Sequence, residues 1–152
     1  MPASNSTDLD PAVLSDPARL VEECYRLISF EPGSEPHWPC FRRLFSDKAV
    51  LALRVFPEDA AITVMTMDEY MVHQMREGMK ERGYSETVLE KRVTRFGDTA
   101  EARVDFEMHF GEAPPVPALD VFQLVHLEER WWIVSIVSDM VVSDIKKGSP
   151  KR

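Results

Sequence analysis

The chain has 152 residues, of which 44% are hydrophobic and 29% charged, and these values are typical of one globular domain rather than of a disordered chain. The formal net charge of −8 disfavours a general nucleic-acid binder and adhesion to an anionic membrane surface, because both depend on clustered lysine and arginine. No apolar run is long enough to span a bilayer, and residues 1–11 lack the basic start and the apolar core of a signal peptide. We therefore expect a cytoplasmic protein.

The residues that commonly bind metals form no recognisable pattern. Cys24 and Cys40 are too few for a disulfide framework and lack metal-ligand spacing, which indicates reduced, structural thiols. The histidines at positions 37, 73 and 126 also lack the spacing of a metal site. We expect no metal and no cofactor.

The first third of the chain predicts helices. Residues 1–15 are polar and proline-containing, and we expect them to form a flexible leader. Asp16 followed by Pro17 is typical of a helix start, and apolar residues then recur at helical spacing as far as Ile28. A short helix is expected near residues 39–45.

The middle of the chain predicts a strand and a longer helix. Residues 49–56 are rich in valine and leucine and favour a strand. Thr66 and Glu69 match a capping box, in which the two side chains satisfy free amides at the start of a helix. Methionines recur every fourth residue along this helix, which we expect to continue to Gly83.

From residue 88 onward the apolar period changes from helical to two, which is typical of half-buried strands. Four strands in a meander are expected at 88–96, 101–110, 121–127 and 131–142. Helices first and antiparallel strands last favour the α+β class, and a curved sheet around a long helix would leave a blind cavity. The domain is expected to span residues 16–143, before a basic, flexible tail at 144–152.

This order of elements resembles the nuclear transport factor 2-like superfamily, which includes ketosteroid isomerases, polyketide cyclases and dehydratases. The most specific motifs are Phe122–Val125 and, after a turn, Arg130–Ile136; Phe45–Ala49 and Tyr25 support them. The resemblance implies a cystatin-like α+β roll, in which a curved sheet wraps around helices as a cone with an internal pocket. It does not imply an activity, because one fold hosts many chemistries.

Three positions compare directly with the isomerases of this superfamily. Tyr25 matches their oxyanion-hole tyrosine, whereas Leu53 stands where they have a catalytic aspartate. Gln123 falls where they have a protonated carboxylic acid. Because a leucine cannot accept a proton, the resemblance disfavours steroid isomerisation, although a tyrosine and an amide could still bind a carbonyl group.

The same alignment, with Gln123 turned inward, sets the expected faces of the sheet. The polar row that alternates with apolar side chains in the strand 101–110 is expected to face outward: Arg103, Asp105, Glu107 and His109. The expected pocket residues are Tyr25, Leu53, Met71, Met75, Phe106, Gln123, Trp132 and Ile136. The expected interface of a homodimer comprises Arg103, Asp105, Phe122, Leu124, Trp131 and Ile133.

Three functions remain open from the sequence. The preferred one is a small-molecule-binding domain with a mostly apolar pocket, whose ligand is apolar or contains a carbonyl group. The second is an isomerase, dehydratase or cyclase-type enzyme, which requires a carboxylate or histidine inside the pocket. The third is a ligand-free dimeric interaction module that uses the apolar outer face of the sheet.

Overall fold

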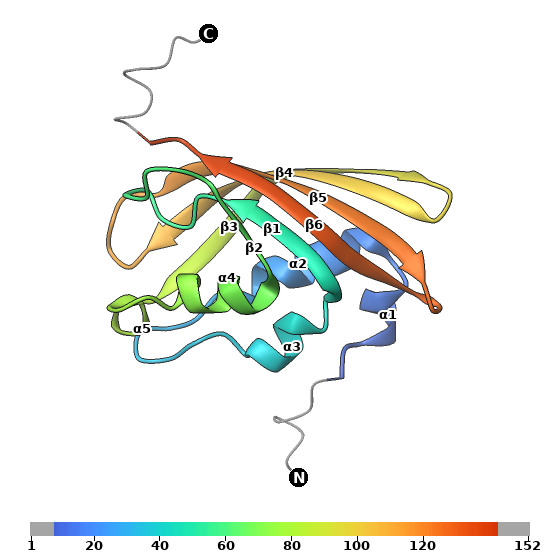
Figure 1. The fold of residues 1–152 in the computed structure, drawn as a ribbon, viewed down its shortest axis with the longest axis horizontal. Helices are drawn as coiled ribbons and strands as arrows, with labels where there is room; N and C mark the ends of the chain where they lie inside the picture. Colours follow the sequence, from blue (N-terminus) through green and yellow to red (C-terminus); the bar gives the residue numbers. More distant parts are fainter. Residues whose placement is uncertain (1–7, 143–152) are drawn as a thin grey trace, which may run out of the picture.

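A computed structural model describes residues 8–142 as one strongly curved sheet with all of its helices on the concave side (Figure 1). The two ends of this segment lie on opposite sides of the molecule. No helix within residues 8–142 is long and apolar enough to cross a membrane. The expected tail at 144–152 and the first seven residues of the expected leader lie outside the described residues. The helices are α1 Pro11–Leu14, α2 Pro17–Leu27, α3 Trp38–Arg42, α4 Met67–Gln74 and α5 Met79–Arg82.

The sheet has six strands in the order β2-β1-β6-β5-β4-β3. Only β1 and β6 run parallel, and the four strands from β3 to β6 form the predicted antiparallel meander. The α+β class and the curved mixed sheet are therefore confirmed. Strand β2 was not predicted. The strands are β1 Phe45–Leu53, β2 Thr63–Met65, β3 Tyr84–Phe96, β4 Thr99–Phe110, β5 Val116–Leu127 and β6 Arg130–Met140.

Helix α2 forms where its sequence predicts and lies on the concave side of the sheet. The Asp16 carboxylate accepts a hydrogen bond from the Ala18 amide at 3.0 Å, and Pro17 occupies the first helical position. The expectation that residues 1–15 form a loose leader is wrong for its described end. There α1 is capped by Asp10 and buries Val13, because even one apolar side chain can anchor a short helix.

The capping box of α4 is present as predicted, but the helix ends earlier than Gly83. Its backbone leaves helical geometry at Met75, and Gly78 adopts a left-handed φ of 95° before α5 begins. In this turn the Arg76 guanidinium binds the Asp59 carboxylate at 2.7 and 2.9 Å. The methionines therefore do not form one continuous helical stripe.

A β-bulge in β6 changes which side chains of the final strand face the core, and they differ from the expected ones. Gln123 pairs with Ser135 while the next residue, Leu124, pairs with Ile133, so that Val134 is an extra residue. Before the bulge, inward-facing side chains are Trp131 and Ile133; after it they are Ile136, Ser138 and Met140.

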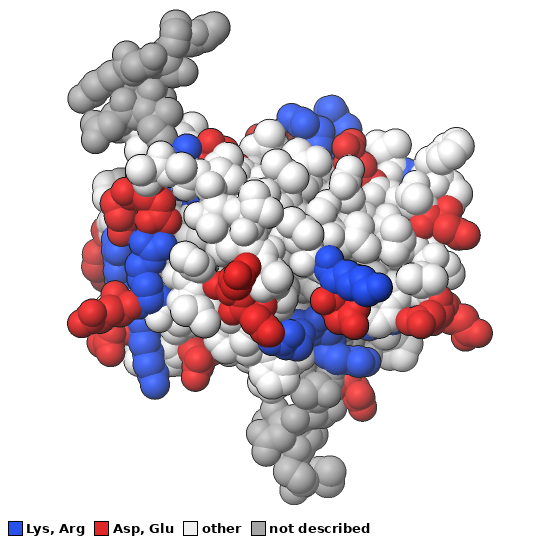
Figure 2. Space-filling view, in the orientation of Figure 1, with Lys and Arg blue, Asp and Glu red and all other residues white. Residues whose placement is uncertain are grey.

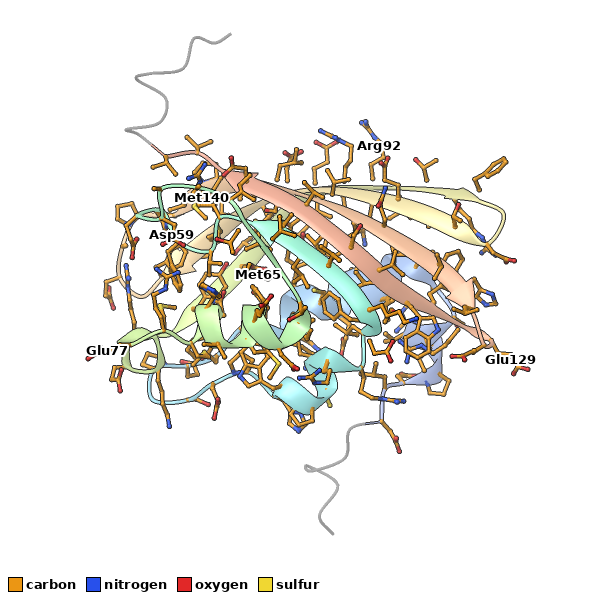
Figure 3. The ribbon with its side chains drawn as sticks, in the orientation of Figure 1. Asp59, Met65, Glu77, Arg92, Glu129 and Met140 are labelled. Atoms are coloured by element: carbon orange, nitrogen blue, oxygen red, sulfur yellow. The ribbon has the colours of Figure 1, made fainter. Side chains whose placement is uncertain are left out.

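Four residues assigned to a dimer interface are core residues. All are at most 1% exposed, because β5 has the opposite register to the expected one and β6 has the opposite register before its bulge. These residues are Phe122, Leu124, Trp131 and Ile133. By contrast, Arg103 and Asp105 are exposed on the outer face, and Glu107 and His109 are in the same row and half-buried, as predicted. The neighbouring Arg92 on β3 also points away from the helices (Figure 3).

The two adjacent tryptophans provide a test of this register. We expect Trp131→Ala to lower the free energy of unfolding by about 3–5 kcal/mol, because it empties a core site. Trp132→Ala should cost only about 1–2 kcal/mol, since this half-buried ring loses a hydrogen bond to the Leu127 carbonyl and a contact with Arg130. Urea denaturation measures both, and equal losses would contradict the bulge.

Candidate functional site

A small cavity of ≈ 40 Å³ lies between the helices and the concave face of the sheet, with room for about three water molecules. Its walls are mainly apolar and come from elements far apart in the sequence. The apolar side chains include Ile28, Phe41, Leu51, Leu53, Phe106 and Ile136. The polar side chains include Gln74, Tyr84, Glu86, Asp120 and Ser138.

Asp120 is the acid in this cavity that accepts two hydrogen bonds. It lies on β5 and is 8% exposed, and its carboxylate accepts a hydrogen bond of 2.7 Å from the Tyr25 hydroxyl. Ser138, its partner across the β5–β6 ladder, donates a second hydrogen bond. Burial raises the Asp120 pKa to about 6, while the hydrogen bonds from Ser138 and Tyr25 act in the opposite direction.

Glu86, on β3, is the second acid. Its carboxyl group is hydrogen-bonded to the Tyr84 hydroxyl. Burial, followed by repulsion from Asp120, raises the Glu86 pKa to about 8, against the opposing hydrogen bond from Tyr84. Between these two values the pair holds one proton. Because Asp120 has two donors and Glu86 has one, the charge resides on Asp120 and the proton on Glu86.

Tyr25 positions Asp120 as well as donating to it. Its ring packs edge-on against Phe106 and Phe122, with centroids 5.3 and 5.8 Å away, so the hydroxyl is held in one direction. Burial and the nearby Asp120 raise the Tyr25 pKa well above its ordinary value. The phenol therefore remains a donor at neutral pH.

Gln74 is the last residue of α4 and is 3% exposed. Its Oε1 accepts a hydrogen bond of 3.2 Å from the Tyr70 hydroxyl. Its Nε2 has no hydrogen-bond partner within residues 8–142. The cavity wall thus contains a donor that the described part of the chain does not satisfy.

One end of the cavity is formed by the connector between β1 and β2. Arg54 and Val55 line the cavity there. The Arg54 guanidinium donates to Asp139 at 2.9 and 3.3 Å and to the Asp59 carbonyl at 3.0 Å. Asp59 in turn binds Arg76, and Figure 3 shows it on this connector, beyond the end of α4. The Arg54 charge is thereby neutralised outside the cavity.

The predicted pocket residues fall into three groups. Leu53, Phe106 and Ile136 line the cavity, and Tyr25 contacts it through Asp120. Met71, within α4, and Met75, just after its end, pack against the core without lining the cavity.

Gln123 and Trp132 lie elsewhere, as a result of the register error described above. Gln123 is exposed on the outer face, where its Oε1 accepts from the Ser135 hydroxyl at 2.9 Å. Trp132 lines a separate surface hollow of ≈ 530 Å³ beside the β5–β6 turn. Neither contributes to the cavity.

The sequence analysis missed the four residues that give the cavity its chemistry, namely Gln74, Tyr84, Glu86 and Asp120. The strands expected at 88–96 and 121–127 begin just after the two acids, whereas the observed strands begin at Tyr84 and Val116 and include them. A signal was present: Ala118, Asp120, Phe122 and Leu124 alternate as one inward row with a single acid in it. Within residues 8–142 no three His, Cys, Asp or Glu side chains are grouped as a metal site.

Comparison with known proteins identifies the fold. No protein-family model matches the sequence, and no curated protein does. Among solved structures, an NTF2-like protein of unknown function from Pseudomonas putida KT2440 is 16% identical, with a TM-score of 0.64 over 87% of this chain and 89% of that one. A cystatin-like protein of unknown function from Nostoc punctiforme is 10% identical, with a TM-score of 0.60 over 82% and 87%.

A third similar structure is the yeast Ubp3-associated protein Bre5, at 12% identity and a TM-score of 0.61 over 80% of this chain and 91% of that one. At such identities the likeness shows the fold alone. The chain therefore has the NTF2-like, cystatin-like fold that the sequence motifs implied, and the solved proteins that share this fold include several of unknown function.

The acid pair predicts an unusual pH dependence of stability. The folded protein retains protons that the unfolded chain, with carboxyl pKa values near 4, has already released. The free energy of unfolding should therefore fall as the pH rises from about 4 to about 8. Urea denaturation at several pH values measures this slope, which Asp120→Asn with Glu86→Gln should flatten and the outer-face control Asp105→Asn should not. An unchanged slope in the double variant would contradict the two raised pKa values.

Proposed function

We propose that this protein binds a small molecule in the cavity and transfers protons on it, as an isomerase or dehydratase-type enzyme does. The observation that carries the proposal is that two carboxyl groups, Asp120 and Glu86, line one small cavity together with the tyrosine hydroxyls that donate to them, and burial raises the pKa of both acids. A proton-transfer site needs such a base and such an acid together, each with a pKa near the working pH.

Each residue has a role in this scheme. Ionised Asp120 accepts a proton from the bound molecule, and Tyr25 and Ser138 hold the carboxylate in place. Protonated Glu86 donates a proton, and Tyr84 orients it. Leu53 then needs no catalytic role, because the base comes from β5 and not from β1.

Binding without chemistry is the second candidate. The apolar walls favour burial of an apolar ligand surface, and this is the function preferred from the sequence. An acid pair whose pKa values are raised by burial lowers stability, however, and a binding site for apolar ligands does not require it. We therefore favour the enzyme.

We also propose that the outer face of the sheet joins two copies of the chain. The outward residues of β5 and β6 are largely apolar and include Leu119, Val121 and Val137. Figure 2 shows a broad uncharged area above a lower rim of charged side chains. Beside the apolar strip, exposed Arg103 and Asp105 supply both signs of charge, so a second copy can present the complementary row.

A cytoplasmic location is consistent with Cys24, a buried thiol.

Proton transfer can be tested without knowing the substrate. A panel of small molecules with acidic C–H bonds, incubated with the protein in D₂O, should include at least one that exchanges hydrogen for deuterium, as followed by NMR. Asp120→Asn and Glu86→Gln should each lower the exchange rate by about 100-fold or more. The outer-face variant Asp105→Asn should match the wild type. Equal rates in the wild type and Asp120→Asn for every compound would refute the proposal.

The dimer can be tested by sedimentation velocity. Wild-type protein at micromolar concentration should sediment as a dimer, and Val137→Glu should sediment as a monomer, because it buries a charge at the centre of the contact. Phe96→Glu is the control, since Phe96 is 85% exposed at the far end of β3 and should leave the dimer intact. A wild-type monomer at this concentration would contradict the proposal.

A further inference from the structure

The side-chain amide of Gln74 is half satisfied. Its Oε1 accepts the Tyr70 hydroxyl, whereas its Nε2 is buried among the cavity-lining atoms without a partner. Buried polar groups almost always have a hydrogen-bond partner, because burial removes the water that would otherwise solvate them. The free N–H bonds of Gln74 therefore indicate where a ligand atom belongs.

The Oε1 and Nε2 atoms of Gln74 cannot exchange positions without a loss of free energy. Tyr70 is buried, and its ring packs against Trp38 and Phe41 at centroid distances of 6.4 and 6.3 Å, which fixes the hydroxyl. Rotating the Gln74 amide by half a turn would leave the Tyr70 O–H without its acceptor. Gln74 therefore presents a donor to the cavity, and it requires an acceptor from the ligand.

The charges around the cavity select a neutral acceptor. The ionised Asp120 carboxylate lines the cavity and would repel an anion. The one cation in the wall among the described residues, Arg54, already donates to the Asp139 carboxylate and cannot compensate a ligand charge without losing that pair. A carboxylate ligand is thus disfavoured, and a carbonyl oxygen is the acceptor that fits.

We propose that Gln74 determines the substrate class: its Nε2 donates a hydrogen bond to the carbonyl oxygen of a small, neutral ketone or aldehyde. This inference rests on the proposed function, because it places the carbonyl compound in the same cavity as the acid pair. The cavity volume of ≈ 40 Å³ limits the substrate to a molecule of a few heavy atoms. An alcohol of the same size binds less well, because its hydroxyl hydrogen also needs an acceptor and the Asp120 carboxylate in this cavity already accepts hydrogen bonds from Tyr25 and Ser138.

The test compares size-matched probes by NMR titration: acetone as the ketone, 2-propanol as its alcohol and acetate as the anion. For wild-type protein we expect acetone to bind about fivefold or more tightly than 2-propanol, and acetate not to bind. Gln74→Leu should abolish the preference for the ketone. Gln123→Leu is the matched control, since Gln123 carries the same amide on the outer face, bonded to Ser135, and should keep the preference.

A second readout does not depend on the folding of a variant. In wild-type protein, the side-chain ¹⁵NH₂ resonances of Gln74 should move on addition of the ketone and stay in place on addition of the alcohol. If a ketone binds but Gln74→Leu retains the preference and these resonances do not move, this inference is wrong while the proposed function stands. If acetate binds as tightly as acetone, the neutral class is wrong. If no probe binds the wild type, this inference is refuted, and the proposed function is then decided by the deuterium exchange alone.

Discussion

The interior of this protein depends on one extra residue in β6, the β-bulge at Val134. Before the bulge, the strand turns Trp131 and Ile133 into the core; after it, the strand turns Ile136 and Ser138 inward. A regular strand starting from Trp131 would direct Ser138 to the outer face. Asp120 would then lose one of its two donors. The same bulge therefore completes the hydrophobic core and brings the Ser138 hydroxyl to the Asp120 carboxylate in the cavity.

The cavity keeps two acids in apolar surroundings at a cost to stability. Burial raises the pKa of both, and each is supported by a tyrosine hydroxyl: Tyr25 for Asp120 and Tyr84 for Glu86. A chain under selection for stability alone would replace such a pair by apolar side chains, which often stabilises the fold. A buried acid pair with its donors in place is consistent with chemistry at this site.

The wall opposite the sheet depends on ion pairs made outside the cavity. Arg54 is bound by Asp139, and Arg76 is bound by Asp59 while its guanidinium lies 3.9 Å from the centre of the Phe56 ring. These contacts hold the β1–β2 connector against the turn that follows α4. Gln74, the last residue of α4, lies two positions before Arg76, which binds Asp59 of the connector.

Local signals in the sequence determined the elements and the fold class. Asp16 with Pro17, the capping box at Thr66 and Glu69, and the alternation in β4 act between residues close in the chain, so they can be read without the structure. The tertiary structure alone decided the register across the bulge and the site. Glu86 and Asp120 lie 34 positions apart in the sequence, each near the start of a strand, and only the curvature of the sheet and its pairing bring them to one cavity. Burial and long-range pairing depend on the whole fold, and a pattern within one segment cannot specify them.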